Sequence, residues 1–158
     1  ADTLVHEWPD EEDLADIAER AASVARGLGL VPRVAFASFS TFGYPVSERA
    51  TKMHLASDAL DKRHVDFEYD GEMTVDVALN PDQMKHYPFC RLTGPANVLV
   101  VPARHSASIS TKLLQELGGA TVIGPILTGV DKPVQIISTG STVNDILNMA
   151  AISACNIG

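Results

Sequence analysis

The sequence contains only two cysteines, Cys90 and Cys155, among its 158 residues. They form no Cys-x-x-Cys pair, so the pattern predicts two reduced thiols in a cytoplasmic protein and neither a disulfide framework nor a zinc site. The sequence also lacks the motifs of a zinc protease, a Rossmann dinucleotide site and a serine-hydrolase nucleophile elbow. The five histidines are scattered, which favours surface or packing positions, and no metal site is predicted.

Long apolar runs are missing as well. No stretch of about 18 apolar residues occurs, so the sequence predicts no membrane span. Basic residues number 12 against 20 acidic ones, and the net charge of −8 argues against nucleic acids or anionic membranes as partners. A small anionic ligand remains compatible, because a few local cations can outweigh the overall charge. The chain opens ADTLVHEW without an initiator Met or a signal peptide, so we expect a fragment of a longer polypeptide.

The second half of the sequence carries three uncharged, strand-like runs, Val98–Val101, Thr121–Ile123 and Val134–Ile137. Each is apolar enough to be buried on both faces, as the strands of a parallel sheet are. Helix-length segments Ser106–Leu117 and Ser141–Ala154 follow the first and the third run, and each has an apolar face that we expect to point inward. Strands that alternate with helices predict a single α/β domain over residues 1–158, with three α/β/α layers and a mostly parallel sheet.

The first half of the sequence predicts further elements of the same kind. Its clearest element is a helix that starts after Asp10 and has three acidic residues in its first turn, where the helix dipole favours them. The other expected elements are a short strand at Thr3–His6, a buried strand at Arg33–Phe39, a helix capped by Ser47, a half-exposed edge strand at His64–Asp70 that ends at Gly71, and a short helix at Pro81–Tyr87. Met73–Asn80 also fits the alternation of a strand, but a helix is favoured there because it would return the chain to the sheet.

Candidate ligand residues follow from this layout, because ligands of open α/β sheets bind beyond the carboxyl ends of the strands. Ser40, Thr41 and Gly43 come directly after the buried strand Arg33–Phe39. Small hydroxyl residues and a glycine suit the close approach of a phosphate or a carbonyl to backbone N–H groups. An ordinary turn between a strand and a helix explains these residues equally well.

Two later segments are candidates for the same reason. Gly124–Gly129 begins like a P-loop, but Val130 and Asp131 stand where the lysine and the Ser/Thr of a nucleotide site belong. Ser138 precedes the expected helix Ser141–Ala154, and Asp145 lies about one turn inside that helix. A serine near helix N–H groups and a carboxylate suits acyl or thiol chemistry, although routine helix capping accounts for both residues too.

Several ungapped blocks resemble the phosphate acetyl- and butyryltransferase family. They are RVAFASFSTFG, YDGEMTVDVAL and GPANVLVVPARHSASISTKLLQELGGATVIGPILTGVDKPVQI. KHYPFCRLTGPANVL, SISTKLLQELGGATVIGP and NDILNMAA are similar to the phosphotransacetylase-like C-terminal domain of the large bacterial malic enzymes. The resemblance covers essentially the whole chain. It implies two α/β subdomains around a cleft, similar to isocitrate dehydrogenase, of which this chain is the second together with the closing helix.

The resemblance also implies a role for the segment Ser138–Asp145. In the acetyltransferases of this family, the matching loop carries Ser, Arg, Gly and a later Asp, which orient the CoA thiol and stabilise the transition state of acyl transfer. Ser138, Gly140 and Asp145 match, whereas Thr139 stands where the family has its catalytic Arg. Ser108 stands where the family usually has Asn. We therefore expect no catalytic residues in this chain.

The expected function is a regulatory, oligomerising domain that binds acetyl-CoA or CoA as an effector and restrains its own N-terminal malic-enzyme domain. That domain would use NAD(P) and Mg²⁺ or Mn²⁺ to decarboxylate malate to pyruvate. The resemblance also implies a homo-oligomer, at least a dimer. The alternatives to the regulatory function are an active phosphate acetyltransferase and an oligomerisation module with a vestigial pocket. The residues expected to contact acetyl-CoA are Ser40, Thr41, Gly43, Arg104, Gly124, Pro125, Gly129, Lys132, Ser138, Thr139 and Asp145, with Arg104 and Lys132 as the main phosphate ligands and Lys85, Arg91 and Lys112 as weaker candidates.

Overall fold

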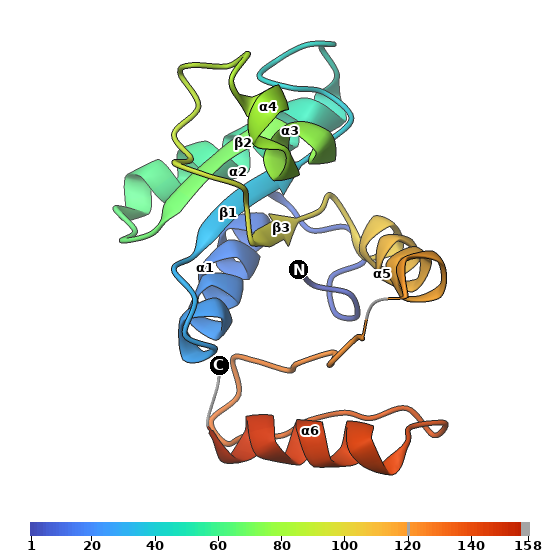
Figure 1. Ribbon diagram of the computed structural model, residues 1–158. Helices are drawn as coiled ribbons and strands as arrows, with labels where there is room; N and C mark the ends of the chain where they lie inside the picture. Colours follow the sequence, from blue (N-terminus) through green and yellow to red (C-terminus); the bar gives the residue numbers. More distant parts are fainter. Residues whose placement is uncertain (120, 156–158) are drawn as a thin grey trace.

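The computed structural model describes residues 1–119 and 121–155 (Figure 1). A three-stranded parallel sheet in the order β2-β1-β3 lies at its centre, with β1 at Arg33–Ala37, β2 at Glu68–Met73 and β3 at Val98–Val100. β1 is the middle strand, and its residues 34–37 are buried because helices or loops cover both of its faces.

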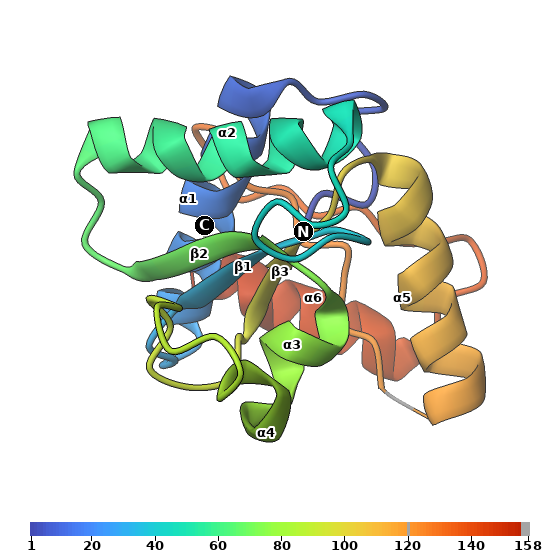
Figure 2. The ribbon, with the colours of Figure 1, turned by 90° about the horizontal axis from the view of Figure 1, so that it is seen from above.

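Helices lie on both faces of the sheet (Figure 2). The helices α1 (Glu11–Gly27) and α2 (Glu48–Arg63) cover one face, where Leu14, Phe36 and Leu60 belong to the larger apolar core. The short helices α3 (Val75–Leu79) and α4 (Pro81–Met84) cover the other face over a smaller core around Met73 and Val77. The predicted three-layer α/β/α architecture is therefore confirmed.

The helix α1 begins as the sequence predicts. The backbone N–H of Asp13 donates to Oδ1 of Asp10 at 2.8 Å, and the backbone N–H of Asp10 donates to Oδ2 of Asp13 at 3.1 Å. This reciprocal capping box satisfies N–H groups that a helix start otherwise leaves without partners. The buried face of α1 then packs along the sheet, which fixes the first layer.

Two strands predicted in the second half do not form. Residues 121–123 and 134–137 have no regular secondary structure, and they pair with no strand among the described residues. Ile123, Val134, Ile136 and Ile137 are each about half exposed. An uncharged apolar run signals burial, but a strand also needs a hydrogen-bonded neighbour, and the described part of the chain offers none to these segments.

The predicted strand at Thr3–His6 is also absent, because Asp2 folds this segment into a turn. The Asp2 carboxylate accepts hydrogen bonds from the backbone N–H groups of Leu4, Val5 and His6 at 3.1, 2.8 and 2.9 Å. A side-chain acceptor that takes up successive backbone donors competes directly with strand pairing.

The edge strand β2 starts four residues and ends three residues later than predicted, and Gly71 falls inside it instead of ending it. Gly71 has φ +141° and lies against Phe36 of β1, where a Cβ atom on Gly71 would be 2.8 Å from the Phe36 carbonyl oxygen. Glycine is needed here both for the backbone conformation and for the close approach of the two strands. The helices predicted on either side, now α2, α3 and α4, are confirmed with somewhat different bounds.

The helices α5 (Arg104–Gly118) and α6 (Val143–Ala154) form as predicted, but the apolar face of α5 is exposed and that of α6 is covered only in part, at Met149 and Ile152. Ile109, Leu113, Leu114 and Leu117 of α5 are 50–82% exposed, and Val143 and Leu147 of α6 are exposed as well. Figure 1 shows α5 beside the end of the sheet and α6 at the bottom, apart from the layered core.

Among the described residues, no helix is long and apolar enough to cross a membrane.

Candidate functional site

The carboxyl ends of the three parallel strands lie at one edge of the sheet. Phe36 near the end of β1 pairs with Val100 at the end of β3, so the loops that follow these strands start side by side. One loop contains Ser40, Thr41 and Gly43, and the other leads into Arg104 at the start of α5. The structure thus places these predicted ligand residues on the edge where α/β sheets bind their ligands.

The loop after β1 is held by Glu72 of β2. Oε1 of Glu72 accepts a hydrogen bond from Oγ of Ser40 at 3.2 Å and another from the backbone N–H of Gly43 at 2.6 Å. The backbone N–H of Phe42 donates to the Glu72 carbonyl oxygen at 2.8 Å. The carboxylate therefore uses the polar groups that would otherwise be available to a ligand.

Glu72 itself is unusual for an acidic residue. Its side chain is 2% exposed, and its second oxygen, Oε2, has no hydrogen-bond partner in the described part of the chain. Nδ1 of His54 lies 3.6 Å from Oε2. Sequence reasoning missed Glu72, because an acidic residue beside a glycine normally indicates an exposed strand end.

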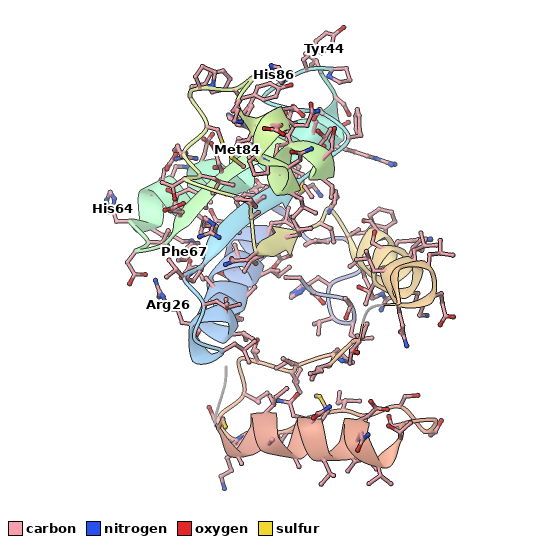
Figure 3. The ribbon with its side chains drawn as sticks, viewed as in Figure 1. Arg26, Tyr44, His64, Phe67, Met84 and His86 are labelled. Atoms are coloured by element: carbon pink, nitrogen blue, oxygen red, sulfur yellow. The ribbon has the colours of Figure 1, made fainter. Side chains whose placement is uncertain are left out.

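The remaining groups of this loop are also engaged within the protein. The hydroxyls of Thr41 and Thr74 lie 3.1 Å apart, and the backbone N–H of Thr74 donates to Oγ1 of Thr41 at 3.1 Å. Tyr44, at the tip of the loop, points away from the fold at the top of Figure 3. Internal bonding makes the loop rigid, so any ligand contacts here would come from a preformed backbone shape.

The segment before α6 contains the predicted residues Ser138 and Thr139, and the predicted residue Asp145 lies in the first turn of α6. Thr142, and not Ser141, is the N-cap of α6, and Oδ2 of Asp145 accepts from both the backbone N–H and the hydroxyl of Thr142 at 2.8 Å. These hydrogen bonds from the Thr142 backbone and side chain lower the pKa of Asp145. The carboxylate is therefore ionised and committed to the helix cap.

The two predicted groups of ligand residues are not brought together. In Figure 1 the loop 40–46 lies at the top, whereas the segment 138–142 lies at the lower right, beyond α5. The exposed Lys132 lies between these groups in sequence, on the irregular segment 121–137. An extended ligand, or a second protein surface, would be needed to connect the two groups.

The glycines of the segment 124–129 have local roles. Gly124 has φ +134° and Gly129 has φ +78°, which favour glycine. Gly129 lies so close to the guanidinium of Arg20 on α1 that a Cβ atom would collide with it. The backbone of Leu127 exchanges two hydrogen bonds with the Gln135 side chain, at 2.9 and 3.3 Å. The segment is thus held to Gln135 through Leu127 and lies against α1 at Gly129.

A cavity of about 370 Å³ lies where Arg104 begins α5. Nη2 of Arg104 is 3.7 Å from the Glu7 carboxylate, and Nη1 donates to the Leu4 carbonyl oxygen at 3.4 Å. Both contacts are long for hydrogen bonds, so the guanidinium is only loosely held. The cavity is lined by Thr3, Leu4, Glu7, Trp8, Arg104, His105, Ser108 and Ile109.

Two of the weaker candidates for phosphate ligands, Arg91 and Lys85, are already bound to other residues of the protein. Arg91 donates to Asp61 at 2.6 Å and to Ser57 at 2.7 Å, and its guanidinium lies 4.6 Å above the ring of Tyr69. Lys85 pairs with Asp82 at 2.6 Å. Arg91 therefore joins α2, β2 and the loop before β3, which is a structural role.

Residues 1–119 and 121–155 contain no group of three or more His, Cys, Asp or Glu suited to a metal ion.

Comparison with protein families matches residues 1–154 to the family described as Phosphate acetyl/butaryl transferase. The chain belongs to this family of α/β proteins. It is 62% identical to an NADP-dependent malic enzyme of Rhizobium meliloti (strain 1021) over all 158 residues, which are 21% of that relative. It is 36% identical to a phosphate acetyltransferase of Bacillus subtilis (strain 168), with 98% of this chain and 48% of the relative covered.

Solved structures agree with this assignment. A phosphotransacetylase from Streptococcus pyogenes superimposes with a TM-score of 0.94 at 34% identity, over 99% of this chain and 48% of that one. The EutD phosphotransacetylase from Staphylococcus aureus gives a TM-score of 0.91 at 33% identity, over 100% of this chain and 49% of that one. The chain thus spans about a fifth of the malic enzymes and about half of the phosphotransacetylases that it matches.

Proposed function

We propose that this chain is the acetyl-CoA-binding, regulatory C-terminal domain of a malic enzyme and that it catalyses no reaction itself. Its similarity over the full 158 residues to an NADP-dependent malic enzyme supports the placement in such a protein. Its similarity to phosphate acetyltransferases supports acetyl-CoA or CoA as the ligand. NAD(P) and Mg²⁺ or Mn²⁺ would then act in the rest of the cytoplasmic protein, which would decarboxylate malate to pyruvate.

The proposal that this chain catalyses no reaction rests on the residues present in the segment 138–145. Acetyl transfer between CoA and phosphate places negative charge on the carbonyl oxygen beside a phosphate anion, and a fixed guanidinium stabilises both. Thr139 supplies one hydroxyl and no charge at this position. Asp145 is already bound to Thr142, 2.8 Å away, so its carboxylate serves the helix cap.

Binding of acetyl-CoA is tested by calorimetric titration of the full-length protein. We expect saturable binding, and we expect Lys132→Ala to weaken it, with a smaller dependence on salt, because the exposed ammonium would be one of the cations near the CoA phosphates. Lys85→Ala, which removes a cation already paired with Asp82, is the matched control. Absence of a binding signal would contradict the proposed ligand, whereas an unchanged Lys132→Ala titration would only remove Lys132 from the site.

Catalytic silence is tested with a coupled acetyl-phosphate assay on the full-length protein and its Thr139→Arg variant. We expect the unmodified protein to turn over at a rate lower than that of an ordinary enzyme by about a hundred- to a thousand-fold, which is the usual cost of losing one electrostatic donor. Turnover of about 10 per second would instead establish an active phosphate acetyltransferase. A rate increase in Thr139→Arg would show that the site is otherwise intact.

A second function has support in the exposed apolar faces of α5 and α6. Faces with residues such as Leu117 and Val143 exposed are typical of interaction surfaces. We therefore propose that the protein is a homo-oligomer, at least a dimer, and that its own malic-enzyme part is a further partner. An oligomerisation module with a vestigial pocket would share these faces, and the acetyl-CoA titration separates it from a regulatory domain.

A further inference from the structure

The cavity at the start of α5 joins two parts of the chain that are distant in sequence. One wall is the turn that the Asp2 carboxylate organises through the backbone N–H groups of Leu4, Val5 and His6. Burial opposes ionisation of Asp2, but these backbone donors and the His6 ring outweigh it and lower the pKa of Asp2. The turn that forms this wall is therefore organised by an ionised carboxylate hydrogen-bonded to three backbone N–H groups.

The lining of this cavity combines an aromatic surface with a guanidinium. Trp8 is the only tryptophan of the chain, and its side chain is 69% exposed at the cavity. Arg104 lines the same cavity, and its nearest carboxylate oxygen, on Glu7, lies 3.7 Å from its Nη2. His105 and Ser108 add a ring nitrogen and a hydroxyl from the first two turns of α5. The volume of about 370 Å³ is within the usual range of small-molecule sites.

This combination matches the two ends of a nucleotide. The flat face of an indole stacks on a purine base, and base stacking on aromatic side chains is a general mode of nucleotide binding. A planar guanidinium forms paired, charge-assisted hydrogen bonds with a phosphate, and Arg104 is only loosely held by Glu7 and the Leu4 carbonyl. The chain has a net charge of −8, so an arginine that lines the same cavity as an exposed indole distinguishes this cavity from the mostly acidic surface.

We propose that this cavity binds an adenine nucleotide, with the base on Trp8 and a phosphate on Arg104. This choice of ligand rests on the proposed function, because coenzyme A carries an adenosine 3′,5′-bisphosphate at one end. The cavity then receives that end of acetyl-CoA and leaves the thioester end free to extend along the protein. Glu7 opposes binding, because its carboxylate stands beside the guanidinium that the phosphate needs.

The test uses the full-length protein and two probes, acetyl-CoA and adenosine 3′,5′-bisphosphate alone. The signal from Trp8 is the difference in tryptophan emission between the unmodified protein and Trp8→Phe, and we expect both probes to quench it with saturation. Trp8→Ala and Arg104→Ala should each weaken the bisphosphate about tenfold, as expected for one lost stacking partner or one lost charged hydrogen-bond pair. Glu7→Gln should strengthen binding.

Arg26→Ala is the matched control, because Arg26 is an exposed arginine paired with Asp66 at 2.6 Å and lies on the far side of α1 from α5 (Figure 3). Its affinity for both probes should be unchanged. If acetyl-CoA binds by calorimetry while Trp8 emission is unchanged and both alanine variants keep full affinity, the nucleotide cavity is wrong and the proposed function stands. If acetyl-CoA does not bind, the proposed function is wrong, and the bisphosphate titration alone then supports or overturns the cavity.

Discussion

Gly71→Ala is expected to leave little folded protein. Gly71 lies inside β2 with φ +141°, and a Cβ atom there would lie 2.8 Å from the carbonyl oxygen of Phe36 and 2.9 Å from its Cβ. Both of these atoms belong to the central strand, so relief of the clash requires the backbone to move. We expect the free energy of unfolding to fall by about 4 kcal/mol or more, which is a large part of the roughly 5–15 kcal/mol that stabilises a typical domain.

The measurement is the yield of soluble protein, followed by thermal unfolding monitored by circular dichroism. Gly94→Ala is the matched control, because a Cβ atom at Gly94 would make only an ordinary contact with the Arg33 side chain, 3.6 Å away. That variant should stay within about 0.5 kcal/mol of the unmodified protein. A Gly71→Ala protein with an unchanged melting temperature would show that β1 and β2 are not packed as closely as described.

Glu72→Ala is expected to destabilise the protein by about 2–5 kcal/mol. It removes the acceptor of the buried Ser40 hydroxyl, which then costs about 1–3 kcal/mol as a donor without a partner, and the charge-assisted hydrogen bond from the N–H of the exposed Gly43, which contributes about 1.5–3 kcal/mol. The part of the loop around Gly43 should lose its fixed shape, whereas the Thr41–Thr74 hydrogen bonds and the bond from the Phe42 N–H to the carbonyl of residue 72 remain. Urea unfolding would measure the stability, and hydrogen exchange of the Gly43 amide would report on the loop.

Glu72→Gln provides the matched comparison. The amide oxygen can accept the same two hydrogen bonds, and the amide nitrogen takes the place of Oε2, which has no hydrogen-bond partner among the described residues and faces Nδ1 of His54 at 3.6 Å. An uncharged group is also cheaper to bury than a carboxylate. We therefore expect Glu72→Gln to stay within about 1 kcal/mol of the unmodified protein. An equal loss in both variants would show that the negative charge of the Glu72 carboxylate is essential to the stability of the protein.

The parts of the fold that were predictable carry local signals. Asp10 and Asp13 mark the start of α1, and the run RVAFA marks β1, because capping and burial act within a few residues. The runs at 121–123 and 134–137 were predicted as strands because they lack charge, yet hydrophobicity does not tell a strand from an extended segment without a neighbour. The exposure of the apolar face of α5 was not predictable either, because periodicity shows which residues share a helix face but not whether another element covers it.

The candidate site was predictable only in its parts. Arg104 and Ser40 follow strands, so their position at the carboxyl edge of the sheet was foreseeable from the order of elements. Glu72 was not, since a carboxylate in a sequence normally indicates exposure and this one is buried. Trp8 and Glu7 reach the cavity only because Asp2 folds the first residues into a turn, and the sequence had instead suggested a strand there. The role of Thr139 came from the family resemblance alone.

The irregular segments at 121–137 have a practical consequence for work with this chain on its own. They present backbone amides and carbonyls outside any strand of the described sheet, next to half-exposed Ile123, Val134 and Ile136. Open backbone edges with apolar side chains are templates for edge-to-edge aggregation. We therefore expect preparations of this chain to associate through these segments in a concentration-dependent way, and subunit counts should be measured over a range of concentrations to separate this association from a specific assembly.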